Sequence, residues 1–306
     1  MFQSAGGPAP AVLRDDDMLC PLEALLGSPA YGSLAELIAG GPDALGAVRA
    51  ATQRAPAAIW KPASTLRLLA PIPRPTKNVF CVGRNYYGHV REGYQARGQD
   101  VKVPEHPQFF SKPPTTVIGP DDPVRLRRSV SEKMDYEVEL AVVIGRSGRD
   151  IPKDRALEHV FGLTVVNDIT ARDLQRRHEQ WFKGKALDNT CPMGPCLVPL
   201  DDAPEIGSLE LTLSVNGEER QRAFASQMIF DVPTLISTLS QGLTLEVGDI
   251  IATGTPEGVG YAMSPPRFLV DGDLIECAIS GIGRLRNKIE LVGDSIGRRG
   301  ELEHAS

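Results

Sequence analysis

Three carboxylates in two separate segments are placed to hold a hard divalent cation. Glu137 and Glu139 stand one residue apart in MDYEVELAVVIG, and Asp168 follows where TVVND gives way to TARDLQ. At the two-residue period of a β-strand, Asp135, Glu137 and Glu139 share one face, while the alternate residues of 134–144 form an apolar face. Carboxylates this close need a counter-cation or shifted pKa values, and oxygen ligands without nearby Cys or His suit Mg²⁺ or Mn²⁺. An isolated Glu-x-Glu would instead indicate a strand with one solvated face.

Asp168 is predicted at the end of a strand, directly before a helix. Thr170 and Asp173 are three positions apart, as in a capping box that opens a helix. Within that helix three polar side chains fall at spacings of three and four, on one face: Arg172, Gln175 and Arg176. This corner suits an anionic ligand, although a capped surface helix with solvated arginines would have the same pattern.

Two further segments could contribute catalytic groups. If GHVREG is helical, the carboxylate of Glu92 can orient and charge-stabilise the imidazole of His89, as a general base requires. Lys185 in WFKGKALDN could supply a fixed positive charge to an oxyanion. A surface His–Glu pair and a solvated lysine are the ordinary alternatives. Gly254 and Thr255 in GTPEGVG indicate a loop that lets backbone approach a ligand, since no Walker or dinucleotide pattern fits.

Composition excludes several kinds of partner. The 306 residues carry a net charge of −6, which argues against a nucleic-acid or anionic-membrane partner. Five cysteines are scattered without metal-ligand or CxxC spacing, so we expect reduced thiols. The chain shows neither the basic stretch and apolar run of a signal peptide nor an apolar stretch of membrane-spanning length. These features predict a cytoplasmic protein.

The chain is predicted to be α+β and strand-rich, with few helices. Residues 1–70 are rich in Ala, Gly and Pro, include the helical patches LAELIAG and ALGAVRAATQ, and are expected to form a small N-terminal accessory region. Residues 71–306 are expected to form a metal-binding catalytic domain. Its predicted strands are NVFCVG, QFFSKP, YEVELAVVIG, GLTVVND, LELTLSVNG, DIIATGT and DLIECAI. Helices are predicted at TARDLQRRH and at DVPTLISTLSQ, the latter capped by Asp231.

Turn signals separate these strands. Asn216–Gly217 predicts a hairpin between two of them. Gly248–Asp249 and Gly272–Asp273 each precede an apolar strand, as though one turn were used twice.

The order of six motifs strongly resembles the fumarylacetoacetate hydrolase family, particularly its acylpyruvase and oxaloacetate-decarboxylase branch. These motifs are VGRNYYGHVREG, PQFFSKPPTTVIGP, DYEVELAVVIG, FGLTVVNDITARDLQ, FKGKALDNTCPMGP and GDIIATGTPEGVG. The match runs from near Pro71 to near Ile289. The resemblance implies a mixed β-roll, usually a homodimer, with a catalytic Mg²⁺ or Mn²⁺.

The resemblance also implies roles for individual residues. It assigns metal ligands Glu137, Glu139 and Asp168, substrate-binding residues Arg172, Gln175 and Thr255, and catalytic residues His89, Glu92 and Lys185. The histidine and glutamate correspond to a dyad on the mobile lid of the acylpyruvase branch. The fumarylacetoacetases proper have a fourth acidic ligand upstream of the histidine, which CVGRNYYG lacks. Fumarylacetoacetate itself is therefore a poor candidate substrate.

The reaction this predicts is cleavage of the carbon–carbon bond of a 2,4-dioxo acid, an acylpyruvate, through a pyruvate enolate that the cation stabilises. A 2-oxo acid substrate leaves three alternatives open: a decarboxylase of the oxaloacetate type, an isomerase or dehydratase of a related 2-oxo acid, and an inactive member that binds a keto acid. The pyruvyl end of the substrate is defined better than its tail. We expect tail specificity to depend on residues 86–94 and on the N-terminal region.

Overall fold

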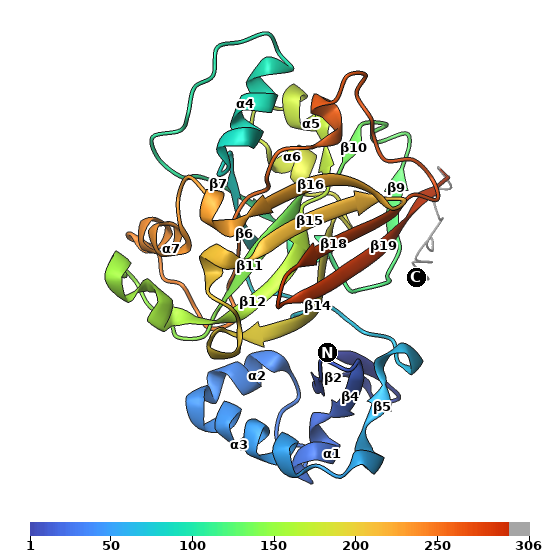
Figure 1. Cartoon of the computed structure of the whole chain (residues 1–306), viewed down its shortest axis with the longest axis vertical. Helices are drawn as coiled ribbons and strands as arrows, with labels where there is room; N and C mark the ends of the chain where they lie inside the picture. The colour runs from blue at the N-terminus through green and yellow to red at the C-terminus, as the bar shows by residue number, and fades with distance from the viewer. Residues whose placement is uncertain (294–306) are drawn as a thin grey trace, which may run out of the picture.

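Two β-sheets form the framework of the chain after residue 70 (Figure 1). The computed structural model describes residues 1–293, so the last part of the predicted 71–306 domain, residues 294–306, lies outside the described residues. The seven-stranded sheet contains, in spatial order, Gln108–Lys112 (β7), Val79–Gly83 (β6), Ile250–Ala252 (β17), Val138–Ile144 (β11), Val160–Asn167 (β12), Cys191–Pro199 (β14) and Val117–Ile118 (β8). The five-stranded sheet contains Glu218–Phe224 (β16), Glu210–Val215 (β15), Leu274–Ile279 (β18), Gly283–Val292 (β19) and Val124–Arg127 (β9).

The main hydrophobic core lies between these two sheets. Leu140 and Leu163 from the first sheet and Leu211 and Ile275 from the second belong to one buried cluster. Every residue of the central strand β11 is buried, because a second cluster takes up Ala141 and its neighbours on the opposite face. The predicted charged face ends at Glu139, and beyond that residue both faces of the strand are apolar, as in a strand covered on both sides.

Helices gather at both ends of the sheets (Figure 1). Near one end lie three short helices, Tyr87–Gln95 (α4), Arg172–Arg177 (α5) and Phe182–Lys185 (α6), and beside the sheets lies Val232–Ser240 (α7). The Asp231 carboxylate accepts the backbone N–H of Thr234, which confirms the predicted cap of α7. Within residues 1–293, no helix is both long and apolar enough to cross a membrane, and all five cysteines are free thiols.

The N-terminal region lies at the opposite end from α4 (Figure 1). It contains the strands Phe2–Ser4 (β1), Gly7–Ala9 (β2), Ala11–Leu13 (β3), Met18–Pro21 (β4) and Lys61–Pro62 (β5), and the helices Leu22–Leu26 (α1), Leu34–Ala39 (α2) and Gly41–Arg54 (α3). Both predicted helical patches are confirmed by α2 and α3. Ile38 of α2 packs into the same cluster as Val79 and Ala141, so the region shares core with the body. The division near residue 70 stays a prediction.

The predicted turns are confirmed. Asn216 and Gly217, both with positive φ (52° and 80°), join β15 to β16. Gly248 and Gly272 have φ of 87° and 86°. In the first turn the Asp249 carboxylate accepts the N–H of Glu246 at 2.8 Å. In the second turn the Asp273 carboxylate accepts the N–H of Val270 at 2.9 Å. One turn geometry is therefore used twice.

The predicted capping box at Thr170 is wrong. Thr170–Ala171 (β13) pairs with Met134–Asp135 (β10), so the helix begins only at Arg172. The Thr170 hydroxyl donates to the carbonyl oxygen of Asp168 at 2.9 Å, so it does not cap the helix. The β10–β13 pairing places the segment after Asp168 beside the start of the acidic segment.

Candidate active site

The three predicted metal ligands meet where β11 and β12 leave the sheet. Antiparallel pairing sets Val138 opposite Asn167, and the backbone N–H of Asp168 donates to the carbonyl of Glu137 at 2.9 Å. One ligand atom from each of Glu137, Glu139 and Asp168 lies within 4.8 Å of the others. All three side chains are buried. Strand register therefore brings together carboxylates that are about thirty positions apart in sequence.

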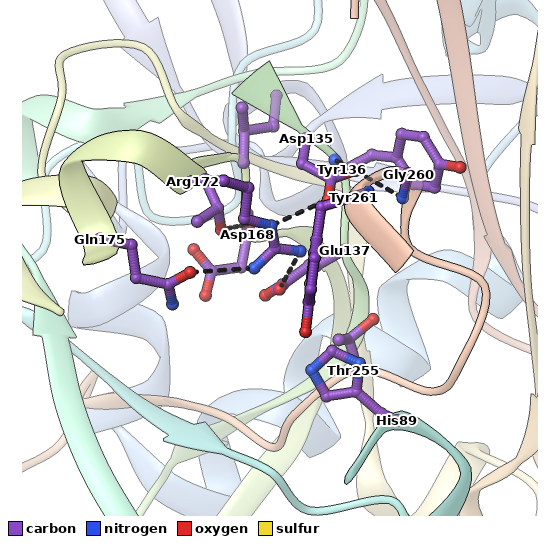
Figure 2. Close-up of polar contacts among 12 residues, drawn as sticks. His89, Asp135, Tyr136, Glu137, Asp168, Arg172, Gln175, Thr255, Gly260 and Tyr261 are labelled. Atoms are coloured by element: carbon purple, nitrogen blue, oxygen red, sulfur yellow. Dashed lines mark hydrogen bonds and ion pairs between the residues drawn. The ribbon is translucent and has the colours of Figure 1, made fainter. Parts of the chain in front are cut away.

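Two cationic side chains bind this carboxylate group. The Lys185 ammonium lies 2.6 Å from both Glu137 Oε2 and Asp168 Oδ2. Arg172 Nη2 lies 2.7 Å from Glu137 Oε1, while its Nε donates to Asp135 Oδ2 at 2.8 Å. Figure 2 shows the guanidinium between the two acids. Burial alone would raise the pKa of Glu137, but the charges of Lys185 and Arg172 outweigh it and lower the pKa to about 2.

A third cation, Lys112, was not predicted. Its ammonium is fully buried, lies 2.9 Å from Asp168 Oδ1, and donates to the backbone carbonyls of Ile169 and Lys185 and to the Thr190 hydroxyl. The only sequence signal was a lysine closing the apolar segment QFFSKP, and a lysine at a strand end is normally solvated. Lys112 thus fixes the carboxylate of Asp168 and the backbone on which Lys185 stands.

We expect Lys112→Met to destabilise the protein by about 3–5 kcal/mol, because it removes one partner from a buried ion pair and strips two carbonyls of their donor. The measurement is the free energy of unfolding in urea without added metal. Lys183→Met, at an exposed lysine two positions from Lys185, is the matched control. An unchanged free energy for Lys112→Met would contradict the structural role.

The arrangement fits a divalent cation. Four buried carboxylates face three buried cations: Asp135, Glu137, Glu139 and Asp168 against Lys112, Arg172 and Lys185. If all are ionised, the cluster carries one net negative charge. Glu139 forms no ion pair among the described residues, and only one of its oxygens accepts a hydrogen bond, from the N–H of Gly254 at 2.9 Å. Burial, followed by the charges of Asp168 and Glu137, raises the pKa of Glu139 well above its usual range.

Asp168 gives the same indication. Its Oδ1 is buried and makes no hydrogen bond to any described residue, although the Lys112 ammonium lies 2.9 Å away. A carboxylate oxygen has more than one lone pair, so this ion pair leaves Oδ1 able to accept a further ligand. An all-oxygen donor set of this kind could hold a hard cation.

The His89–Glu92 pair lies on α4, which confirms the helix that the pairing required. His89 Nδ1 lies 2.8 Å from Glu92 Oε1, and Glu92 Oε2 accepts the N–H of Gly258 at 2.8 Å. Glu92 therefore ties the helix to the glycine-rich loop. In Figure 2 the His89 imidazole and Thr255 lie on the side of Glu137 away from Asp135.

A cavity of about 370 Å³ joins the helix to the carboxylates. Seven predicted site residues line it: His89, Glu137, Glu139, Arg172, Gln175, Lys185 and Thr255. The other two contact lining residues, Asp168 through Lys185 and Glu92 through His89. The structure brings all nine together, and their roles stay predictions.

Comparison with known proteins identifies the family. The sequence model of a protein family, described as "Fumarylacetoacetate (FAA) hydrolase C-terminal", matches residues 78–290, most of the chain. The chain belongs to the fumarylacetoacetate hydrolase family. "Oxaloacetate tautomerase YisK" of Bacillus subtilis (strain 168) is 54% identical over 226 residues, which are 74% of this chain and 74% of that relative.

Solved structures of family members share the fold. Fumarylacetoacetate hydrolase from the psychrophilic Exiguobacterium antarcticum has 39% identity and a TM-score of 0.79, over 95% of this chain and 98% of its own. The 5-carboxymethyl-2-hydroxymuconate delta-isomerase from Mycobacterium smegmatis has 39% identity and a TM-score of 0.66, over 76% and 86%. The predicted family and its strand-rich α+β fold are confirmed.

Two polar residues that were not among the predicted site residues hold parts of the site in place. Asp135 accepts four hydrogen bonds, from Arg172 Nε and from the backbone N–H groups of Tyr136, Gly260 and Tyr261. It thereby anchors the glycine-rich loop to Arg172, and its place on the acidic face was the available signal. The second residue is a glutamine, Gln221, on β16.

Gln221 positions Thr255. Its amide donates to the Thr255 hydroxyl at 2.9 Å, and its carbonyl accepts the N–H of Val138 at 3.0 Å. Gln221 therefore connects the two sheets and contacts Thr255, which lines the cavity. No spacing rule could identify it, because its partners lie far away in sequence.

Proposed function

We propose that the protein interconverts the keto and enol forms of a 2-oxo acid such as oxaloacetate, as a divalent-metal-dependent tautomerase. The observation that carries this proposal is the presence, in one cavity, of the His89–Glu92 pair and the Glu137–Glu139–Asp168 carboxylate group. The name of the Bacillus subtilis relative, an oxaloacetate tautomerase at 54% identity, supports it.

The cation proposed is Mg²⁺ or Mn²⁺, held by Glu137, Glu139 and Asp168. When bound, it supplies positive charge at the 2-oxo oxygen, which makes the C3 proton more acidic. The net charge of −1 on the surrounding cluster becomes +1 with a divalent ion, so a substrate carboxylate would neutralise it. Arg172 and Gln175, joined by a hydrogen bond of 3.3 Å, are placed to orient that carboxylate. Thr255, fixed by Gln221, would contact the same end.

His89 is the proposed proton carrier. If Nδ1–H donates to Glu92, the lone pair of Nε2 is free to accept the C3 proton. The electron pair of the C3–H bond then forms the C2=C3 double bond, and the 2-oxo oxygen gains the negative charge. The ammonium of Lys185 lowers the energy of that oxyanion. Return of the proton to this oxygen gives the enol, and the reverse sequence gives the ketone.

Carbon–carbon bond hydrolysis of an acylpyruvate is the second candidate. The same His89–Glu92 pair could take a proton from water that attacks a distal ketone, with Lys185 and Gln175 stabilising the oxyanion. The hydrolase title of the Exiguobacterium antarcticum structure supports it. Decarboxylation of oxaloacetate would need the same charge stabilisation without water.

The test is a substrate panel with Mg²⁺ or Mn²⁺, before and after EDTA. We expect loss of the enol absorbance of oxaloacetate well above the uncatalysed rate, abolished by EDTA and restored by either metal. Faster cleavage of acylpyruvates would establish the hydrolase instead, and faster carbon dioxide release the decarboxylase. Activity that survives chelation would contradict the metal site, and binding without turnover would indicate an inactive keto-acid-binding member.

Two further properties remain proposals. We propose a homodimer, as the family resemblance implies, which sedimentation equilibrium would test. A cytoplasmic location is supported by the five free cysteines, and fractionation of cells would check it.

A further inference from the structure

Three arginines at the cavity have no acidic partner among residues 1–293. Arg84, Arg97 and Arg176 line the cavity with the predicted site residues, and none of them forms an ion pair with any residue of 1–293. Arg172 differs, because the carboxylates of Asp135 and Glu137 already balance its charge. Cationic groups without partners beside a cavity indicate an anionic ligand.

Aromatic rings hold these arginines around the cavity. The Arg84 guanidinium lies 5.6 Å from the Tyr94 ring centre and 5.4 Å from that of Trp181. Arg97 lies 4.9 Å from the Tyr94 ring, so the two arginines share one aromatic partner. Such contacts restrict the side chains without neutralising their charge.

Arg176 comes from the other side, on α5. Its guanidinium lies 5.6 Å from the ring centre of Tyr261, a residue that also lines the cavity. A methyl group at Gly93 would come within 2.7 Å of the Tyr261 hydroxyl and 3.8 Å of Arg97 Nη1, so Arg97 and Tyr261 lie close together. The three arginines therefore lie around one part of the cavity, although Arg84 precedes α4, Arg97 follows it and Arg176 lies on α5.

The backbone before α4 is shaped for this arrangement. Arg84 has a positive φ of 57°, which is unfavourable for a residue with a side chain and is often found at functional sites. Gly83 precedes it, where a Cβ would lie 2.1 Å from the Trp181 ring. Glycine at this position lets Trp181 pack close enough to support Arg84.

We propose that Arg84, Arg97 and Arg176 bind a second carboxylate, at the tail of the substrate, so that the substrate class is a 2-oxo dicarboxylic acid. The inference rests on the proposed function, in which the carboxylate group and Arg172 take the pyruvyl end. Arg97 and Arg176 are exposed and Arg84 is half-buried. The one acidic side chain on the same part of the lining, Glu179, is also exposed, so three positive charges face one negative charge and the region is net positive. Arg97 Nε donates to the side-chain oxygen of Gln99 at 3.1 Å, but a neutral acyl tail would leave all three arginines without an anionic partner.

The experiment compares oxaloacetate with its 4-methyl ester, which has the same four-carbon chain and a neutral tail. Arg97→Gln and Arg176→Gln are each expected to raise KM for oxaloacetate about tenfold, the value of one charge-assisted hydrogen bond, with a much smaller effect on kcat. KM for the ester and inhibition by oxalate, which lacks a tail, should not change. Arg84→Gln should raise KM for oxaloacetate to a similar extent, and the Arg97/Arg176 double variant should raise it further.

Neighbouring arginines provide the controls. Arg91→Gln on α4 and Arg177→Gln on α5 remove exposed charges that do not line the cavity, and should leave both substrates unaffected. Equal increases in KM for oxaloacetate and the ester, or no increase for either, would overturn the inference. If the wild type turns over neither, the proposed function fails. The arginine subsite is then tested by calorimetric titration of the Mn²⁺-loaded protein with oxaloacetate and with the ester. Tighter binding of oxaloacetate by the wild type, lost in the variants, would support the subsite. Equal affinity of the wild type for the two compounds would overturn it.

Discussion

Glu139→Gln is expected to abolish catalysis and yet to stabilise the protein when no metal is present. Loss of one of three carboxylate ligands should lower kcat/KM at least about 10³-fold, since charge stabilisation at the oxyanion is the largest catalytic term. The stabilisation follows from the raised pKa of Glu139, which burial and the charges of Asp168 and Glu137 cause. Glutamine has the same shape as glutamate but carries no charge. Glu139→Gln therefore removes the cost of ionising a buried carboxyl group and stabilises the folded state.

The sign of the pH dependence follows from linkage. Below the ordinary glutamate pKa of 4.5, Glu139 is protonated in both folded and unfolded chains, so its contribution to stability is fully present. As pH rises above that value, the unfolded chain releases this proton while the folded chain retains it, so folding loses free energy up to the raised folded pKa. We therefore expect the metal-free wild type to lose thermal stability from pH 5 upward relative to Glu139→Gln.

The measurements are melting temperatures with EDTA across this pH range and Mn²⁺ titration by calorimetry. Each kcal/mol of difference should shift the Tm by roughly 2–4 °C in a chain of this size. Mn²⁺ should stabilise the wild type and affect the variant little. Glu105→Gln, at an exposed glutamate, is the control. If Glu139→Gln bound Mn²⁺ like the wild type, the assignment of Glu139 as a ligand would be wrong.

Sequence patterns located the acidic group because its geometry is local to two strands. The Glu137–Glu139 alternation lies in one segment, and Asp168 ends the strand that pairs with it, so a register of neighbouring strands suffices to join them. His89 and Glu92 were likewise found because three-residue spacing on a helix is a local relation. These are the features that a single segment encodes.

The capping box failed because two local interactions compete for Thr170. Its hydroxyl could have capped a helix, but Thr170 pairs with Asp135 of β10 instead, and the hydroxyl donates to the Asp168 carbonyl. Arg176 was found by its helical spacing from Arg172, but Lys112, Gln221, Arg84 and Arg97 could not be predicted for another reason. Their partners lie in distant segments that only the packing of the two sheets and α4 brings together.

His89→Gln should lower kcat by about 10²- to 10⁴-fold, the usual contribution of a general base, while leaving Mn²⁺ affinity nearly unchanged. The reason is geometric: His89 lines the cavity beside the carboxylates, but its only hydrogen-bonded side-chain partner among the described residues is Glu92. Stopped-flow decay of enol-oxaloacetate and calorimetric Mn²⁺ binding give the two readouts. His178→Gln, at an exposed histidine outside the cavity lining, is the matched control.

Glu92→Gln separates the two functions of the pair. The amide oxygen can still accept the N–H of Gly258, which ties α4 to the glycine-rich loop, but the negative charge that stabilises a protonated imidazole is lost. We expect kcat to fall by about 10- to 10²-fold, less than for His89→Gln, because the base itself remains. If His89→Gln turned over oxaloacetate like the wild type, the proton would have to be carried by another group.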